Sequence, residues 1–237
     1  MKTSNSQQNN FMSLISMISL KISKNHLSRF FLFLIAFFCM SSPLYADSQI
    51  NSTSSSSAKD NTGYGYLALE DMEGGGDYNI GIGYKAGQRI TTGDNNTAVG
   101  SNAMYSMTIG RENTAIGSGA LYTQAYNYRN TAVGFEALHS SGNTYQNTAI
   151  GTKSMRGLTT GVVNTAVGHN AMEALTEGDG NVCLGPSCLS GMSTGDYNVA
   201  LGHSAGAGNG SNNIFIGFAA GGQESGSQKL YIDSSNT

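Results

Sequence analysis

NTAVGSNAM, residues 96 to 104, is one copy of a unit that returns along most of the chain. Its first Asn recurs at one step of 18 residues, seven of 17 and one of 15, at Asn61, Asn79, Asn96, Asn113, Asn130, Asn147, Asn164, Asn181, Asn198 and Asn213. Repetition at one short period predicts a solenoid, because such a unit cannot bury its apolar side alone and must stack on its neighbours. Seventeen residues suit two short strands and two tight corners. The sequence therefore predicts an all-β solenoid of about ten coils.

Two columns of identical residues refine this prediction, when positions are counted from the repeat Asn. Position five is Gly in all ten copies, from Gly65 to Gly217, which indicates a corner that needs positive φ or a close approach of two backbones. Position four is mostly Ile, Val or Leu, which favours a strand. The Asn column predicts a ladder of side-chain amides, each bonded to the next coil.

The two faces of this strand are both free of charge. Positions two and four share one face, and position three, usually Ala, shares the other with Gly. One face can point into the coil, and the other needs cover from outside it. Because a coil offers few apolar side chains, we expect the chain to self-associate. Position two is often Thr, but Ile80 and Val182 stand in the same column, so we expect this column to face inward.

The second half of each unit varies more. Position eight is usually Ala and position nine is often Leu or Met, and polar residues and a turn follow. We expect this half to begin in the core and to end on the surface. Its exposed side chains are the expected location of any binding surface. They include Tyr105, Tyr122, Tyr126, Tyr128, Arg129 and Tyr145.

The segments outside the repeats have other compositions. Residues 1–46 resemble an export signal, with basic residues before the apolar run at 30–40 and a cleavage site after Ala46; a retained signal anchor is the alternative, and Met12 or Met17 could be the true start. Residues 47–60 are Ser-rich and predict a flexible linker. The repeats occupy residues 61–222. Residues 223–237 are either a cap or the start of a truncated continuation.

The charge balance disfavours several partners. The whole chain has 12 basic and 15 acidic residues, and removal of residues 1–46 leaves 8 basic residues and a net charge of −7. Nucleic-acid binding and a polybasic attachment to lipid both require a basic face. We therefore expect neither, and no membrane insertion of the mature repeats.

The residues that carry chemistry are few. Cys183 and Cys188 replace Ala at positions three and eight of one repeat, and a disulfide and two buried free thiols are both open. His139, His169 and His203 are spread over several coils, and the Asp residues beside the turns, such as Asp94, need only turn chemistry. No nucleophile elbow, metal-ligand spacing or phosphate loop is present. We expect no enzyme activity, cofactor or metal.

The repeat units also resemble those of a known family. NTAVGSNAM, NTAIGSGAL, NTAVGFEAL, NTAIGTKSM and NTAVGHNAM are similar to the head repeats of YadA-like trimeric autotransporter adhesins, and related repeats occur in fibrous phage proteins. The resemblance covers residues 61–222. It implies a left-handed parallel β-roll in which three chains pack around a common axis, and a role in bacterial surface adhesion. Such adhesins usually continue into a coiled-coil stalk and a membrane barrel, and neither pattern precedes Thr237.

The resulting hypothesis is a non-enzymatic, exported, homotrimeric adhesin head on the cell surface or in the medium. Its ligand would be a host matrix protein or a glycan. A structural fibre segment and an ice-binding solenoid are the alternatives. An exposed flat array of Thr would favour ice binding, and the expected inward Thr column argues against it.

Overall fold

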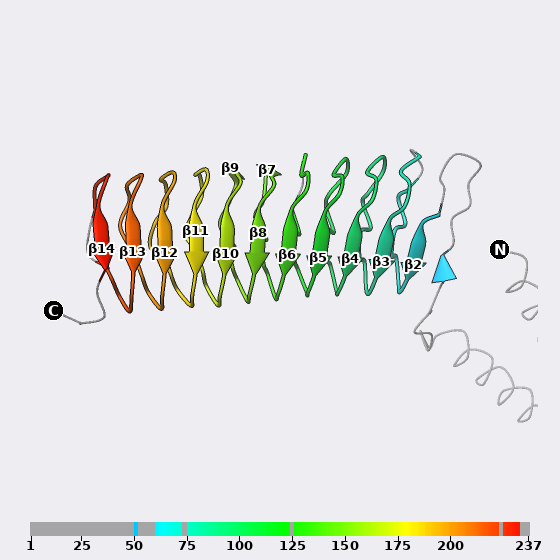
Figure 1. Ribbon diagram of the computed structural model, residues 1–237. Coiled ribbons are helices and arrows are strands. Elements are labelled where there is room, and N and C mark those ends of the chain that lie inside the picture. The colour runs from blue at the N-terminus through cyan, green and yellow to red at the C-terminus, as the bar shows by residue number, and fades with distance from the viewer. Residues whose placement is uncertain (1–49, 52–59, 73–74, 124–125, 223–224, 233–237) are drawn as a thin grey trace, which may run out of the picture. The chain divides into compact units, whose positions relative to one another are not determined.

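The computed structural model describes residues 50–51, 60–72, 75–123, 126–222 and 225–232. These residues form an all-β solenoid of about ten coils, stacked along one axis (Figure 1). The described part contains no helix, and so no apolar helix that could cross a membrane. The predicted export signal, residues 1–46, lies outside the described residues.

Each coil contributes one strand of three residues to a single long sheet. In spatial order the parallel strands are β2 (Thr62–Tyr64), β3 (Ile80–Ile82), β4 (Thr97–Val99), β5 (Thr114–Ile116), β6 (Thr131–Val133), β8 (Thr148–Ile150), β10 (Thr165–Val167), β11 (Val182–Leu184), β12 (Val199–Leu201), β13 (Ile214–Ile216) and β14 (Leu230–Ile232). Like positions pair in register: Ala98, for example, is the partner of Ala115. The repeat columns of the sequence are therefore rows of neighbours in space.

Both ends of this sheet extend beyond the repeats. Strand β1 (Ile50–Asn51) pairs antiparallel with β2, although it lies in the segment for which the composition predicts a flexible linker. At the other end, β14 pairs with β13 in the same parallel register, and the backbone N–H of Lys229 donates to Asn213 Oδ1 as a repeat Asn would. Residues 229–232 thus continue the solenoid without the repeat sequence.

The second half of the coil differs from the prediction of two strands per coil. A second sheet is assigned only for β7 (Asn143–Tyr145) and β9 (Thr160–Val162). After the Gly, each repeat coil continues in consecutive tight turns. In one of them the N–H of Ala120 donates to the carbonyl of Gly117, and Leu121 adopts φ of 50°. Positive φ at positions seven and nine is incompatible with a strand, and it lets the chain reverse direction within a few residues.

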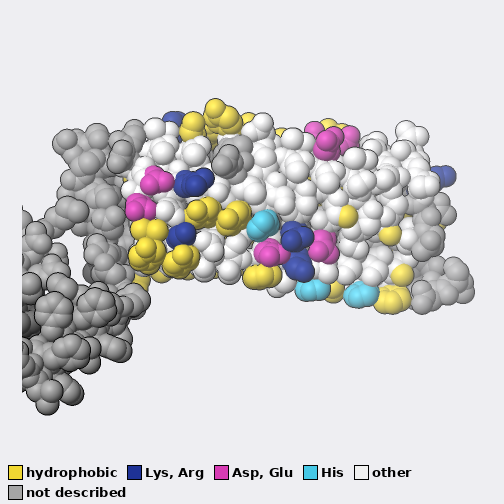
Figure 2. All heavy atoms as spheres, turned by 180° about the vertical axis from the view of Figure 1, so that it is seen from behind, with side chains coloured by type: hydrophobic (Ala, Val, Ile, Leu, Met, Phe, Trp, Pro, Cys, Tyr) yellow, Lys and Arg dark blue, Asp and Glu magenta, His cyan; other side chains and the backbone are white. Residues whose placement is uncertain are grey.

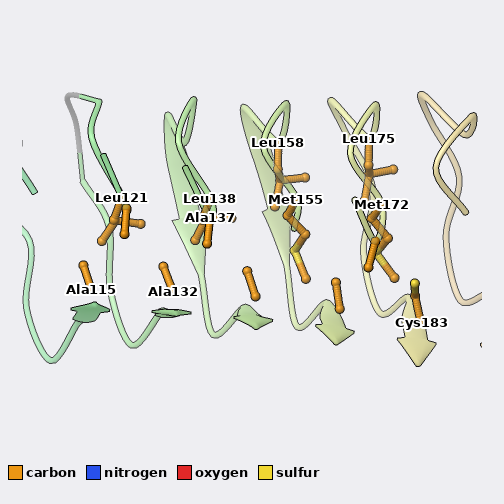
Figure 3. Close-up of a cluster of buried hydrophobic side chains, with 14 of the residues drawn as sticks. Ala115, Leu121, Ala132, Ala137, Leu138, Met155, Leu158, Met172, Leu175 and Cys183 are labelled. Carbon is orange, nitrogen blue, oxygen red and sulfur yellow. The ribbon is translucent and has the colours of Figure 1, made fainter. Parts of the chain in front are cut away.

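The interior of the coil is filled from two sides. Ala at position three points inward from the strands, and Ala and Leu or Met at positions eight and nine point back from the turns, as Ala115, Ala132, Leu121 and Leu138 show in Figure 3. All four side chains are fully buried. The expectation that the second half begins in the core is confirmed. Small residues on the strand leave room for large ones on the opposite wall.

The Asn column forms the predicted amide ladder. Asn130 Nδ2 donates to the carbonyl of Thr144 at 2.8 Å and to Asn113 Oδ1 at 3.3 Å. Every repeat Asn is buried, so these hydrogen bonds satisfy polar groups that would otherwise be costly to bury. The ladder also fixes the register of each coil on the next.

The Gly column meets both conditions predicted for it. Gly100 has φ of +132°, and a Cβ built there would lie 2.6 Å from the carbonyl oxygen of Gly117 in the next coil. Any larger residue would clash with that backbone. Consecutive coils therefore approach each other closely at this corner.

Candidate interaction surfaces

The outward face of the long sheet is a row of apolar side chains. We call the side chains at positions two and four of the parallel strands the strand-face stripe. The exposed fraction is 42% for Ile116, 39% for Ile150 and 44% for Leu184. Eleven strands at ~4.8 Å spacing make the stripe about 48 Å long. Contiguous exposed apolar surface is typical of interaction sites.

The prediction that the Thr column faces inward is wrong. Thr97, Thr114 and Thr131 lie at position two, on the outward side of their strands, and are partly exposed, whereas the intervening Ala98 is fully buried. Position three is Ala, Gly, Cys or Phe in the ten repeats, so the alternation of the pleat puts position two outside. The exchange of Thr with Ile and Val reflects a half-exposed position.

A first group of polar and aromatic side chains lies at the corner after the strand. We call Tyr66, Tyr84, Lys85, Arg89, Tyr105, Tyr122 and His139 the basic-aromatic patch. Tyr105, Tyr122 and His139 stack in one column, with ring centroids 5.3 and 5.0 Å apart. Lys85 Nζ lies 5.2 Å from the Tyr84 ring centroid and 5.5 Å from that of Tyr105. Figure 2 shows a face on which Lys and Arg side chains lie beside hydrophobic ones.

Two pKa shifts arise at this patch. A hydrogen bond with Tyr84 raises the pKa of Lys85, and partial burial lowers the pKa of His139.

Of the residues in this patch, the sequence predicted Tyr105 and Tyr122 as exposed side chains of a binding surface, but it did not predict Tyr66, Tyr84, Lys85 or Arg89. The spacing of 18 residues between Tyr66 and Tyr84 equals the first repeat step, so their stacking at 5.6 Å could have been predicted from the columns.

A second group lies at the corner before the strand. The rings of Tyr128 and Tyr145 stack with their centroids 5.5 Å apart and their planes within 3°. Arg129 Nε donates to Glu112 Oε2 at 2.8 Å, and this arginine lowers the pKa of Glu112. The structure thus divides the exposed residues named from the sequence between two corners. Tyr126, which is 51% exposed, stacks with no other ring among the described residues.

The two cysteines of the repeats meet inside one coil. The structure places the sulfur atoms of Cys183 and Cys188 in bonding contact, as a disulfide. Both residues are fully buried and stand where the preceding coil has Ala166 and Ala171. A bond here links strand β11 to the turn that follows it.

The His and Asp residues considered as metal ligands do not cluster among the described residues. In the described ranges, no group of three or more His, Cys, Asp or Glu residues could hold a metal ion. His203 stacks on Phe218 at 5.4 Å, and Asp94 Oδ1 accepts a hydrogen bond from the backbone N–H of Asp77 at 3.0 Å. Such carboxylates bond the backbone of the neighbouring coil, as turn chemistry requires.

The chain was also compared with known proteins. No family model, curated protein or solved structure matches it. Inference about function therefore rests on the repeat, on the fold and on the surfaces described above.

Proposed function

We propose that this chain is the head of an exported, homotrimeric adhesin with a left-handed β-roll, displayed on the bacterial surface or secreted. The observation that carries the proposal is the strand-face stripe, in which Ile and Leu side chains are exposed and Val side chains partly exposed along the long sheet. The similarity of the repeats to YadA-like heads supplies the number of chains and the handedness.

The stripe is suited to contact with identical copies. It has the repeat of the solenoid itself, so three chains in the same register would bring Ile116 opposite Ile116 and Ile150 opposite Ile150 around the axis. Burial of apolar area at ~25 cal/mol per Å² would stabilise this assembly and complete the interior that one thin coil provides. The two corners would remain at its periphery as binding surfaces.

Light scattering on the protein purified from cells that express the full chain tests this proposal, with N-terminal sequencing to establish where the chain is cleaved. A mass of three processed chains is the expected result, and adhesion assays on matrix proteins and glycans would follow. A stable monomer at micromolar concentration would contradict the adhesin head. A trimer that adheres to nothing would favour the structural fibre.

The outward row of Thr side chains supports ice binding as a second candidate function. Thr97, Thr114 and Thr131 form an outward, regularly spaced row on a parallel sheet, which is the arrangement that an ice-binding face requires. In a trimer this row would be covered. Thermal hysteresis from a monomeric chain would support ice binding, and its absence from a trimer would support adhesion.

A further inference from the structure

The corner before the strand contains a hollow of about 530 Å³. It is lined by Arg111, Glu112, Tyr128, Arg129, Tyr145 and Gln146. Ligand pockets in proteins commonly measure 300 to 1,000 Å³. The hollow has room for a ligand the size of a small oligosaccharide. Its lining residues occupy the two columns before the repeat Asn in three consecutive coils, so neighbouring coils build it together.

Each of the two arginines forms one ion pair and keeps further N–H donors available. Arg111 Nε lies 3.3 Å from Asp94 Oδ2, and Arg129 Nε lies 2.8 Å from Glu112 Oε2. Each pair uses the Nε side of the guanidinium, and the terminal nitrogens have no partner among the described residues. The side chains are 53% and 62% exposed. Each arginine can therefore donate further hydrogen bonds to a ligand without losing its anchor.

The tyrosines add donors of the same kind. The stacked rings of Tyr128 and Tyr145 line the hollow, and each carries a hydroxyl that can donate a hydrogen bond. Their hydroxyls make no hydrogen bond within the described part of the chain. With the guanidinium ends, the hollow offers mainly donors, which suits a ligand rich in acceptor oxygens.

The local charges do not attract polyanions in general. Arg111 and Arg129 are balanced by Asp94 and Glu112. A single carboxylate can meet the free guanidinium ends, whereas a densely charged polymer would also meet the two acids and an acidic chain. This balance favours a ligand with one carboxylate among many hydroxyls.

A peptide fits the hollow less well. The backbone of this corner is already paired between coils, since the N–H of Arg129 donates to Arg111 and the N–H of Gln146 donates to Tyr128. An extended peptide therefore finds no free strand edge to join. No aliphatic side chain lines the hollow to receive an apolar anchor.

We propose that this hollow binds a carboxylate-bearing saccharide, with the acid group on the free ends of Arg111 and Arg129 and the hydroxyls on Glu112, Gln146 and the tyrosine hydroxyls. This inference rests on the proposed adhesin function, because it names the ligand class of that adhesin. It does not depend on the trimer, since one chain forms the whole hollow.

Titration calorimetry on the full-length chain with a sialic-acid-terminated trisaccharide and with its neutral, desialylated counterpart tests this assignment. The acidic sugar should bind and the neutral one should bind at least about tenfold more weakly, because charge-assisted hydrogen bonds are lost. Equal binding of the two sugars, or binding of neither, would overturn it. Binding of a Glu-rich peptide in preference to the sugar would do the same.

Variants locate the site. Arg129→Gln should weaken binding of the acidic sugar at least about tenfold. Arg156→Gln is the matched control. Arg156 Nε pairs with Glu136 Oε2 at a distance of 2.7 Å, and neither residue lines the hollow, so this variant should leave the affinity for the sugar unchanged. Equal losses in both variants would contradict the proposal, with thermal unfolding of each as the check on folding. A trimer that binds no sugar would overturn only this inference, whereas a monomer that binds it would overturn only the trimeric head.

Discussion

Asn130 Oδ1 accepts two hydrogen bonds from Asn147 one coil further on, from the backbone N–H at 2.9 Å and from Nδ2 at 3.2 Å. Asn130 Nδ2 donates to the carbonyl of Thr144, which lies in the same coil as Asn130. One buried amide therefore joins its own coil to both neighbours. The repetition of this arrangement makes the stack cooperative.

Asn130→Ala should lower the free energy of unfolding by roughly 3 kcal/mol, because it leaves the buried backbone N–H of Asn147 without an acceptor and removes the side-chain bonds to Thr144 and Asn113. Urea denaturation followed by circular dichroism would measure the change. Ser118→Ala, at an exposed position, is the control and should cost less than about 0.5 kcal/mol. Similar losses in both variants would show that the ladder contributes little.

Ile150→Glu should dissociate the proposed trimer, because it places three carboxylates around the common axis, where the apolar stripe would be buried. Light scattering would show the fall in mass. Tyr126→Glu exchanges another exposed residue, an aromatic one outside the stripe, and should leave the mass unchanged. An intact trimer in the Ile150 variant would place the interface elsewhere.

Reduction of the Cys183–Cys188 bond should lower the free energy of unfolding by about 2 kcal/mol, since the bond closes a short loop. Intact mass spectrometry before and after reduction and alkylation would count the free thiols. The double replacement Cys183→Ala with Cys188→Ala restores the residues of the preceding coil and should remain folded. Free thiols at both Cys183 and Cys188 in the unreduced protein would exclude the disulfide.

Val163→Asn should stabilise the chain by up to about 1 kcal/mol. Val163 is β-branched and has φ of 60°, where side chains other than Gly and Asn are strained, and it is 54% exposed, so little packing is lost. Asn95 and Asn212 already occupy this column. Thermal unfolding would measure the gain, and Val163→Thr, which keeps the branch, should show none.

Acidification should destabilise the fold through His139. Burial lowers the pKa of His139 below its unfolded value of about 6.5, so the unfolded chain binds the proton more tightly. This contribution to stability is fully present above pH ~6.5 and is lost as the pH falls through the lower folded pKa. His139→Tyr would continue the stack of Tyr105 and Tyr122 without titrating in this range. Parallel pH profiles of unfolding for the two chains would refute the assignment.

The sequence by itself determined the coil period, the registered columns, the buried Ala and Leu or Met at positions eight and nine, and the Asn ladder. These features follow from local periodicity, because in a solenoid each residue meets its own counterpart one period away. Asn96 and Asn113 could be paired by counting alone. The tightness of the Gly corner was equally readable from an unbroken column.

Only the tertiary structure decided which strand face is outside, how the second half of the coil turns and which surface side chains meet. Alternation separates Thr97 and Val99 from Ala98 but does not say which side is the interior, since both sides lack charge. That choice depends on the volume left by the opposite wall, where large side chains such as Leu121 and Met104 share one core with the strand Ala residues. The hollow at Arg111 and Tyr145 likewise arises from the three-dimensional course of the corners, which no single column encodes.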